Sequence, residues 1–165
     1  MGGTPEKFSD DASLFSSMAK ETFFLKNPGS GLLAKLCNNV LLAVNILMLS
    51  KCYALTKRSI DPAVLSEVFN ASTGGSWANL FYCPSPGIVA SAPSSNDFDT
   101  GFNINLMIKD LKLAREYFQT PVEINLILSS LIDAYENTKE FIGDIPKDFS
   151  IIYEYMKKFN ATSVA

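Results

Sequence analysis

A single long helical pattern, from Leu32 to about Lys57, most constrains the fold of this 165-residue chain. It is apolar around nearly its whole circumference, which is typical of a helix that is buried on all sides. A helix of about 25 residues is about 38 Å long, at a rise of about 1.5 Å per residue. A domain of this size cannot easily cover such a helix. The sequence therefore predicts that the helix runs through an interface, either with another domain or with another subunit.

The first thirty residues carry different signals from the rest. Pro5 lies near the start of a short amphipathic helix that we predict over 4–19. Residues 21–25 are rich in Phe and Thr and predict a short strand, and residues 27–31 predict a turn. Everything after this point is predicted as helix and loop, so the expected fold class is mainly α.

The remaining helical segments begin and end at recognisable residues. Asp61 offers a capping side chain, and Pro62 follows at the first helical position. Gly143 stops one helix and Asp148 caps the last. We predict helical segments over 61–72, 76–82, 100–118, 121–142 and 148–159. Residues 83–101, with three prolines, two glycines and four serines, predict a long irregular loop of the kind that is often functional.

Composition excludes several kinds of site. The chain has no histidine, which removes Ser-His-Asp and Cys-His catalysis and the commonest metal ligand. Cys37, Cys52 and Cys83 lie far apart, so we expect no disulfide framework, no zinc site and an intracellular compartment. The net charge of −3 provides no basic face for nucleic acid. Proton transfer must therefore fall to Lys, Asp, Glu, Tyr or Cys.

No membrane attachment is expected. The N-terminal residues have no basic stretch followed by an apolar one, so they do not form a secretory signal. The most apolar run, Val40–Leu49, contains Asn45 and is only ten residues long. We interpret this run as too short and too polar to span a membrane.

The stretch with the most chemical information is Gly29-Ser-Gly31-Leu-Leu-Ala-Lys35-Leu-Cys-Asn38-Asn39. Its two glycines let the backbone turn tightly and let a ligand approach closely. Lys35 and Asn39 are four residues apart, so both project from one face of the helix. A polar pair on a buried helix is costly unless it is used, and burial favours the neutral form that a lysine base needs. The alternative, given equal weight, is a lysine that reaches solvent while the asparagines satisfy loop backbone.

Two other groups have simpler explanations when each is viewed alone. Lys109 and Asp110 fit an ordinary exposed charge pair on an amphipathic helix. Trp77 and Tyr82 fit a core aromatic group beside a rigid Pro-x-Pro-Gly turn at 84–87.

The chain contains neither a Walker A pattern nor a G-x-G-x-x-G pattern. It therefore shows no phosphate or dinucleotide cradle of its own.

Taken together, the motifs resemble those of the β-hydroxyacid dehydrogenase family, and of its hydroxyisobutyrate-oxidising members most of all. These proteins carry Gly-x-Gly followed by Lys and an Asn pair, then a Trp and a Tyr before Pro-x-Pro-Gly. A Pro-Ser-Asn loop, Gly-Phe, Lys-Asp-Leu and Lys-Asp-Phe-Ser follow. The matching stretches of this chain, in the same order, are residues 29–39, 77–87, 93–96, 101–102, 109–111 and 147–150. Several motifs in the same order are far more specific than any one of them.

The resemblance implies a two-domain enzyme of which this chain is the C-terminal part. Residues 29–165 would form the helical catalytic and oligomerisation domain of a 6-phosphogluconate dehydrogenase-like enzyme. Residues 1–28 would be the helix-strand end of a Rossmann-type NAD-binding domain. The main cofactor site would then be absent from this chain, and we expect the chain alone to be inactive.

The resemblance also implies roles for single residues. Lys35 would be the catalytic general acid/base, and Asn39 would bind the substrate. Trp77 and Tyr82 would form walls of the substrate pocket, with Asp110 also on the substrate side.

Lys109 and Phe102 would contact the NAD cofactor. The chain departs from the family at Lys26, where a glycine is usual, and at Cys83, where an asparagine is usual. Neither departure touches the predicted acid/base.

The reaction implied is NAD-dependent oxidation of 3-hydroxyisobutyrate to methylmalonate semialdehyde, a step of valine catabolism. The alternatives are a related dehydrogenase or semialdehyde reductase with another small substrate, and a non-catalytic helical assembly module. We expect a homodimer or homotetramer, with no nucleic-acid or membrane partner. The expected compartment is the mitochondrial matrix in a eukaryote and the cytoplasm in a bacterium. The choice between NAD and NADP would be made in the other domain.

Overall fold

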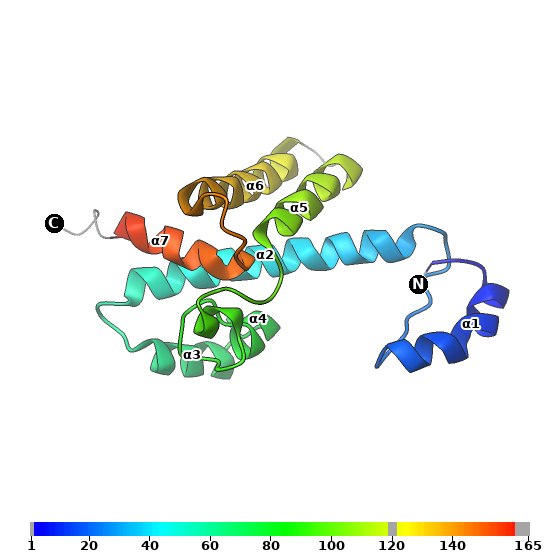
Figure 1. The fold of residues 1–165 in the computed structure, drawn as a ribbon, viewed down its shortest axis with the longest axis horizontal. Coiled ribbons are helices and arrows are strands. Elements are labelled where there is room, and N and C mark those ends of the chain that lie inside the picture. The colour runs from blue at the N-terminus through cyan, green and yellow to red at the C-terminus, as the bar shows by residue number, and fades with distance from the viewer. Residues whose placement is uncertain (1, 119–121, 161–165) are drawn as a thin grey trace. The chain divides into compact units, whose positions relative to one another are not determined.

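The computed structural model describes residues 2–118 and 122–160, and it contains helices and loops (Figure 1). The chain forms two compact units, Met1–Asn38 and Asn39–Ala165. The boundary between the units falls inside the longest helix, α2 (Ser30–Thr56). Each unit is described by itself below.

The first unit holds α1 (Pro5–Met18) and the first turns of α2. Pro5 occupies the first turn of α1, as predicted. The strand predicted over 21–25 is wrong, because these residues have no regular secondary structure. A strand needs a neighbour for its backbone hydrogen bonds, and no strand is present among the described residues.

Lys26 has a backbone conformation that explains the glycine usual at its position in the family. Its φ angle is +58°, a region that residues with a Cβ rarely adopt. The Lys26 carbonyl accepts a hydrogen bond of 3.0 Å from the Gly3 amide. Gly29, at φ +86°, then turns the chain into the start of α2 at Ser30.

Helix α2 confirms the long helix predicted from the sequence, and the described residues cover only part of its circumference. One face within the second unit is buried, at Ala43, Ile46, Ser50 and Tyr53. The apolar side chains of the opposite face are exposed: Leu41, Val44, Met48 and Leu55. The reason is that the described part of the chain packs on one side of this segment.

The length of α2 bears on the membrane question. An 18-residue window of this helix has a mean hydropathy of 1.8, and 22% of the window is buried. By length and composition α2 could therefore cross a membrane, which the ten-residue run Val40–Leu49 did not indicate. The buried core helices of soluble proteins meet the same criterion.

Two short helices follow α2 and pack against each other. Helix α3 (Pro62–Ala71) begins as predicted, with the Asp61 carboxylate accepting a hydrogen bond from the Ala63 amide at 2.8 Å. Helix α4 (Trp77–Phe81) confirms the short helical segment, and Ser76 caps it.

The loop predicted over 83–101 is irregular apart from one 3₁₀ turn, η1 (Pro93–Asn96). Helix α5 (Ile104–Phe118) begins later than the predicted start at 100 or 101. Gly101 has a φ angle of +104°, which is not helical, and the Asn103 side chain then accepts a hydrogen bond from the Asn105 amide. The side chain of Asn103 therefore acts as the N-terminal cap.

The C-terminal part forms a helical layer with α5. Helix α6 (Val122–Ile142) lies beside α5 (Figure 1) and ends at Gly143 with φ +70°. Pro121, the predicted start of this helix, lies outside the described residues. Asp148 caps the 3₁₀ turn η2 (Phe149–Ile151), which continues into α7 (Ile152–Asn160). The largest fully buried apolar side chains of this part are Ile104, Met107, Leu111, Ile132, Tyr135, Phe149 and Ile152.

Candidate active site

A hydrogen bond joins two of the predicted site residues across the fold. The Asn39 amide nitrogen, on α2, donates to Asp110 Oδ2, on α5, at 2.7 Å. Asp110 is only 1% exposed, and the Lys109 ammonium lies 3.2 Å from its other oxygen. The interpretation of Lys109 and Asp110 as an ordinary exposed charge pair is therefore wrong for the aspartate, although the Lys109 side chain is 57% exposed.

Lys35 is a residue of the first unit, and it is exposed. Of the two alternatives for this lysine, a buried base and a side chain that reaches solvent, its exposure in this chain matches the second. Lys35 and Asn39 both belong to α2, so the helix retains their spacing of four residues.

Four aromatic rings connect the surface near Trp77 with the core of the second unit. Trp77 is 59% exposed, so its interpretation as a core aromatic is wrong. It stacks on Tyr82 with the ring centres 6.0 Å apart, and Tyr82 stacks on Phe149 at 5.8 Å. Phe149 then contacts Tyr135, whose hydroxyl donates to the Ala43 carbonyl of α2 at 2.9 Å. Both residues predicted as pocket walls thus belong to one packed row.

Asp148 lies at the base of this row and is 2% exposed. Its Oδ2 accepts hydrogen bonds from the Tyr82 hydroxyl and from the Phe102 amide, both at 2.6 Å. Its Oδ1 accepts from the Ser150 amide at 2.9 Å and from the Ser150 hydroxyl at 2.5 Å. Burial raises the pKa of Asp148, although these four donors act in the opposite direction. Burial and the hydrogen bond to Asp148 together raise the pKa of Tyr82.

Gly101 and Phe102 sit directly against this carboxylate. A Cβ on Gly101 would overlap Asp148 Oδ2, and it would lie 2.5 Å from the Tyr82 hydroxyl and 2.6 Å from Pro93 Cγ. This close approach explains why a glycine precedes Phe102. The Phe102 ring packs edge-on against Phe149, with the centres 6.1 Å apart.

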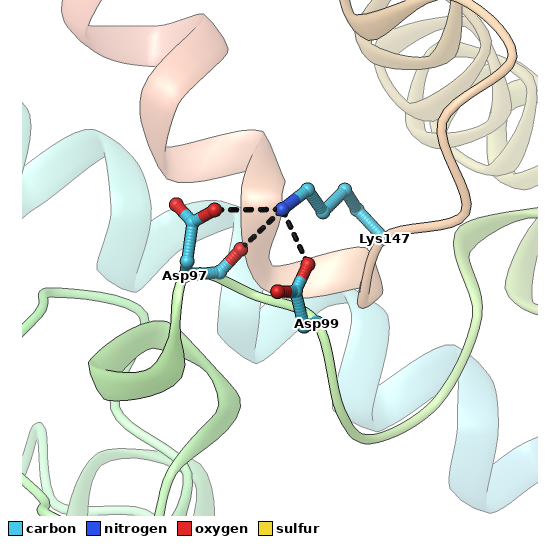
Figure 2. A network of polar contacts seen from close by, with 3 residues as sticks. All are labelled: Asp97, Asp99 and Lys147. Carbon is cyan, nitrogen blue, oxygen red and sulfur yellow. Dashed lines mark hydrogen bonds and ion pairs between the residues drawn. The ribbon is translucent and has the colours of Figure 1, made fainter.

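A second polar contact fixes the end of the loop (Figure 2). The Lys147 ammonium donates to the Asp97 carbonyl at 2.7 Å and pairs with the Asp97 and Asp99 carboxylates at 2.9 and 2.5 Å. The hydrogen bond to Asp99, followed by the one to Asp97, raises the pKa of Lys147. Asp97 and Phe98 have φ angles of +49° and +58°, and the burial of the Phe98 side chain and the bonds to Lys147 hold this uncommon conformation.

Cys83, at the position where asparagine is usual in the family, is completely buried. Its carbonyl accepts a hydrogen bond of 2.6 Å from the Ser94 hydroxyl. Burial raises the pKa of the Cys83 thiol, which keeps it protonated and unreactive at neutral pH. The cysteine therefore serves as a small core residue under the loop.

The structure also shows an open groove of about 460 Å³ between α5 and α6. Its lining residues are Asn105, Ile108, Lys109, Lys112, Leu113, Glu116, Glu136 and Lys139. Lys109 is the only predicted site residue among them, and Lys112 and Glu136 form an ion pair of 2.6 Å. This groove is thus separate from the row formed by Trp77 and Tyr82.

Sequence reasoning missed the part played by Asp148. Its motif, Lys147-Asp148-Phe149-Ser150, was noted, but its local spacing indicated only a helix cap. The contacts with Tyr82 and Phe102 join residues 66 and 46 positions apart in the sequence. No local signal predicts such contacts.

Residues 29–156 match the family model described as "NAD-binding of NADP-dependent 3-hydroxyisobutyrate dehydrogenase". This chain belongs to the β-hydroxyacid dehydrogenase family. Among its relatives in the family, the mitochondrial 3-hydroxyisobutyrate dehydrogenase of Mus musculus is 33% identical over 159 residues, which are 96% of this chain and 47% of that protein. The NAD-dependent L-serine dehydrogenase of Pseudomonas aeruginosa is 35% identical over 153 residues, covering 92% of this chain and 51% of that protein.

A solved structure of a family member shares the fold. The 3-hydroxyisobutyrate dehydrogenase of Mycobacterium tuberculosis, in a structure with L-serine, matches with a TM-score of 0.84 and 28% identity. The match covers 94% of this chain and 53% of that one. The chain thus has the mainly α fold of the helical domain in 6-phosphogluconate dehydrogenase-like enzymes, and it spans about half the length of the relatives that it matches.

Proposed function

We propose that this chain is the helical, lysine-bearing part of an NAD-dependent dehydrogenase that oxidises 3-hydroxyisobutyrate to methylmalonate semialdehyde. The observation that carries the proposal is the position of Lys35 and Asn39 in α2, at the start of the segment that matches the family model. The contact of Asn39 with the buried Asp110 supports it, because a fixed asparagine is suited to orienting a ligand.

The proposed reaction needs a group that moves a proton and a group that orients the substrate. Lys35 Nζ, in its amine form, takes the proton of the substrate hydroxyl and returns it in the reverse direction. Asn39 hydrogen-bonds the substrate, and its bond to Asp110 fixes the rotation of its amide. The rings of Trp77 and Tyr82 shape the pocket for a small aliphatic chain.

NAD, when bound, would supply the hydride acceptor for the oxidation. The chain offers two residues that fit a contact with it. The exposed Lys109 ammonium can donate to ribose or phosphate oxygens, and its position beside the buried Asp110 limits its motion. The Phe102 ring lies on a backbone that Asp148 fixes, so it offers a stable apolar surface.

The proposed division of the chain follows the same reasoning. We place the helical domain at 29–165, and the family match from residue 29 supports this boundary. Residues 1–28 then belong to the end of the cofactor domain. The exposed apolar face of α2 supports its role as an interface helix, between domains or between the subunits of a homodimer or homotetramer. Sedimentation of the complete protein at several concentrations measures the subunit number.

The test of the catalytic assignment is the Lys35→Ala variant of the complete protein. We expect turnover of 3-hydroxyisobutyrate with NAD to fall by about 100- to 10,000-fold, the usual contribution of a general acid/base. The melting temperature should stay near that of the wild type, because Lys35 is exposed. Lys57→Ala, another exposed lysine, is the matched control and should leave turnover unchanged.

Unchanged turnover in Lys35→Ala would refute the role of Lys35. A wild-type protein that binds no NAD and turns over no hydroxy acid would favour the helical assembly module instead.

A second substrate is supported by two of the similar proteins. One is an NAD-dependent L-serine dehydrogenase, and the similar solved structure is of a hydroxyisobutyrate enzyme with L-serine. Both substrates are three-carbon chains with a carboxylate and a terminal hydroxyl, which differ in a methyl or an ammonium group. The ratio of kcat/KM for the two acids decides between them. A role in valine catabolism, in the mitochondrial matrix or the bacterial cytoplasm, follows only if 3-hydroxyisobutyrate is preferred.

A further inference from the structure

We propose that Asp148 is a positioning residue that holds the Tyr82 ring and the Phe102 backbone in place for substrate and cofactor, without touching either ligand. The roles of Tyr82 and Phe102 rest on the proposed function. The contacts of Asp148 with them do not, because they are properties of the fold.

The hydrogen bonds of Asp148 leave it no capacity for a ligand. Each carboxylate oxygen has about two acceptor positions. Oδ2 receives the Tyr82 hydroxyl and the Phe102 amide, and Oδ1 receives the amide and the hydroxyl of Ser150. The carboxylate is 2% exposed, so a substrate cannot replace these donors without opening the core. Asp148 is thus suited to hold protein groups and unsuited to act as a base.

Half of these contacts go beyond what a helix cap requires. A cap at this position needs one oxygen to accept the backbone amide two or three residues later, and Oδ1 does this with Ser150. Oδ2 instead faces Tyr82 and Phe102, which come from other parts of the chain. Burying a carboxylate is expensive, and an uncharged cap such as Ser or Asn would avoid much of that expense. The second oxygen therefore indicates a purpose beyond capping.

The contact with Tyr82 determines what this residue can offer a ligand. Its hydroxyl donates to Asp148 and accepts a longer bond, of 3.3 Å, from the Phe102 amide. Its two neighbouring rings, Trp77 and Phe149, stack nearly parallel to it, at 25° and 24°. The hydroxyl is therefore committed to the protein interior, and Tyr82 contributes its ring to the pocket.

The contact with Phe102 extends the effect of Asp148 to α5. The Asp148 amide donates to the Phe98 carbonyl at 2.8 Å, and the Phe149 amide donates to the Phe102 carbonyl at 2.9 Å. These bonds tie 98–102 to 148–149 just before α5 begins at Ile104. Helix α5 carries Asp110, which fixes Asn39. Asp148 thus orders both the aromatic row and the start of α5, the helix whose Asp110 fixes Asn39.

The test uses the complete protein with Asp148→Asn, Tyr82→Phe and the double variant. The side-chain amide in Asp148→Asn has a single oxygen, whereas the wild-type carboxylate has two oxygens that accept hydrogen bonds. We therefore expect the hydrogen bond with Tyr82 to weaken. We expect the KM for the hydroxy acid to rise about tenfold, the usual effect of losing one charge-assisted hydrogen bond. We expect kcat to change less and the pH profile of kcat to keep its shape. The double variant should have the KM of Asp148→Asn alone, because both changes break one link.

Two controls separate positioning from capping and from a general change of charge. Ser150→Ala removes a donor to Oδ1 only and should leave KM near the wild-type value. Asp144→Asn makes the same chemical change at an exposed aspartate and should alter nothing. A KM that rises equally in Ser150→Ala would show that Asp148 acts only as a cap. A shifted pH profile in Asp148→Asn, or additive effects in the double variant, would overturn the proposal.

A spectroscopic measurement tests the link without any turnover. Burial, and then the hydrogen bond and charge of Asp148, raise the pKa of Tyr82, so Asp148→Asn should let Tyr82 ionise at lower pH. Burial, and then the charge of Asp148, also raise the pKa of Tyr135, so the titration needs the double variant to tell the two tyrosines apart. Ultraviolet titration detects this step, and its absence in the double variant assigns it to Tyr82. If the wild type oxidises no hydroxy acid but Asp148→Asn lowers the pH at which Tyr82 ionises, the proposed function fails and the contact between Asp148 and Tyr82 stands. If that pH does not change, the contact itself is wrong. Should Asp148→Asn fail to fold, an unchanged KM in Tyr82→Phe alone refutes the proposal.

Discussion

Replacing Gly101 with alanine tests the packing around Asp148 most directly. The added Cβ would overlap Asp148 Oδ2 and would lie 2.5 Å from the Tyr82 hydroxyl. It would also lie 2.6 Å from Pro93 Cγ, which belongs to a rigid ring. Real Cβ contacts are longer than 3 Å, so at least one of these neighbours must move. The hydrogen-bonded side chains of Asp148 and Tyr82 are less restrained than the Pro93 ring. We therefore expect these two side chains to move.

The expected loss of stability has two parts. The backbone at Gly101 has a φ angle of +104°, and a residue with a Cβ in the left-handed region costs about 1–2 kcal/mol. Displacing Tyr82 from Asp148 breaks a hydrogen bond to a charged group, which is worth about 1.5–3 kcal/mol. The sum is about 2.5–5 kcal/mol, a large part of the roughly 5–15 kcal/mol that stabilises a domain. A loss of this size lowers the melting temperature by roughly 5–20 °C for a domain of this size.

Urea and thermal unfolding of Gly101→Ala measure this loss, and Gly87→Ala is the matched control. Gly87 has a similar φ angle, +85°, but nothing lies within 4 Å of its added Cβ. The control therefore carries only the backbone part, about 1–2 kcal/mol. If Gly101→Ala is no less stable than Gly87→Ala, the close approach of Gly101 to Asp148 and Tyr82 is wrong.

Three further changes have expected outcomes. Asn79→Ala should cost about 1–3 kcal/mol in urea unfolding, because it removes the oxygen that accepts a hydrogen bond of 2.6 Å from the buried Tyr53 hydroxyl. An unchanged free energy of unfolding would contradict this. Because the pKa of Lys147 is raised, its contribution to stability is full below the ordinary lysine pKa and is lost as pH rises through the raised value. Lys147→Met should therefore flatten the dependence of the unfolding free energy on pH in that alkaline range. An unchanged dependence would show that the two aspartates do not hold this lysine. Lys26→Gly should relieve the left-handed backbone. The net gain in stability should be small, about 0–1 kcal/mol, since glycine also loses more entropy on folding. Slower hydrogen exchange of the Gly3 amide would support this prediction, and faster exchange would argue against it.

Most of the helices could be predicted because their signals are local. Asp61 caps α3 and Gly143 ends α6 through contacts within a few residues, so the order of residues alone contains the information. The strand expected over 21–25 failed for the opposite reason. A strand depends on a partner, and no partner strand is found among the described residues.

The candidate site divides in the same way. Spacing along one helix was enough to place Lys35 and Asn39 on one face of α2. Burial was not predictable from spacing, because it depends on what covers each side chain. Lys35 is exposed, one of two alternatives that its pattern left open, and Asp110 is buried, where its pattern indicated an exposed charge pair.

The sequence by itself determined the mainly α fold, the family and the residues that carry the proposed chemistry, because periodicity, caps and ordered motifs are properties of the chain in one dimension. Only the tertiary structure decided which of those residues meet. Asn39 reaches Asp110 across 71 positions, and Asp148 gathers Tyr82 and Phe102 from two other segments. Such contacts arise when helices pack and polar groups that leave water must find partners, and the distance along the chain does not limit which partners they find.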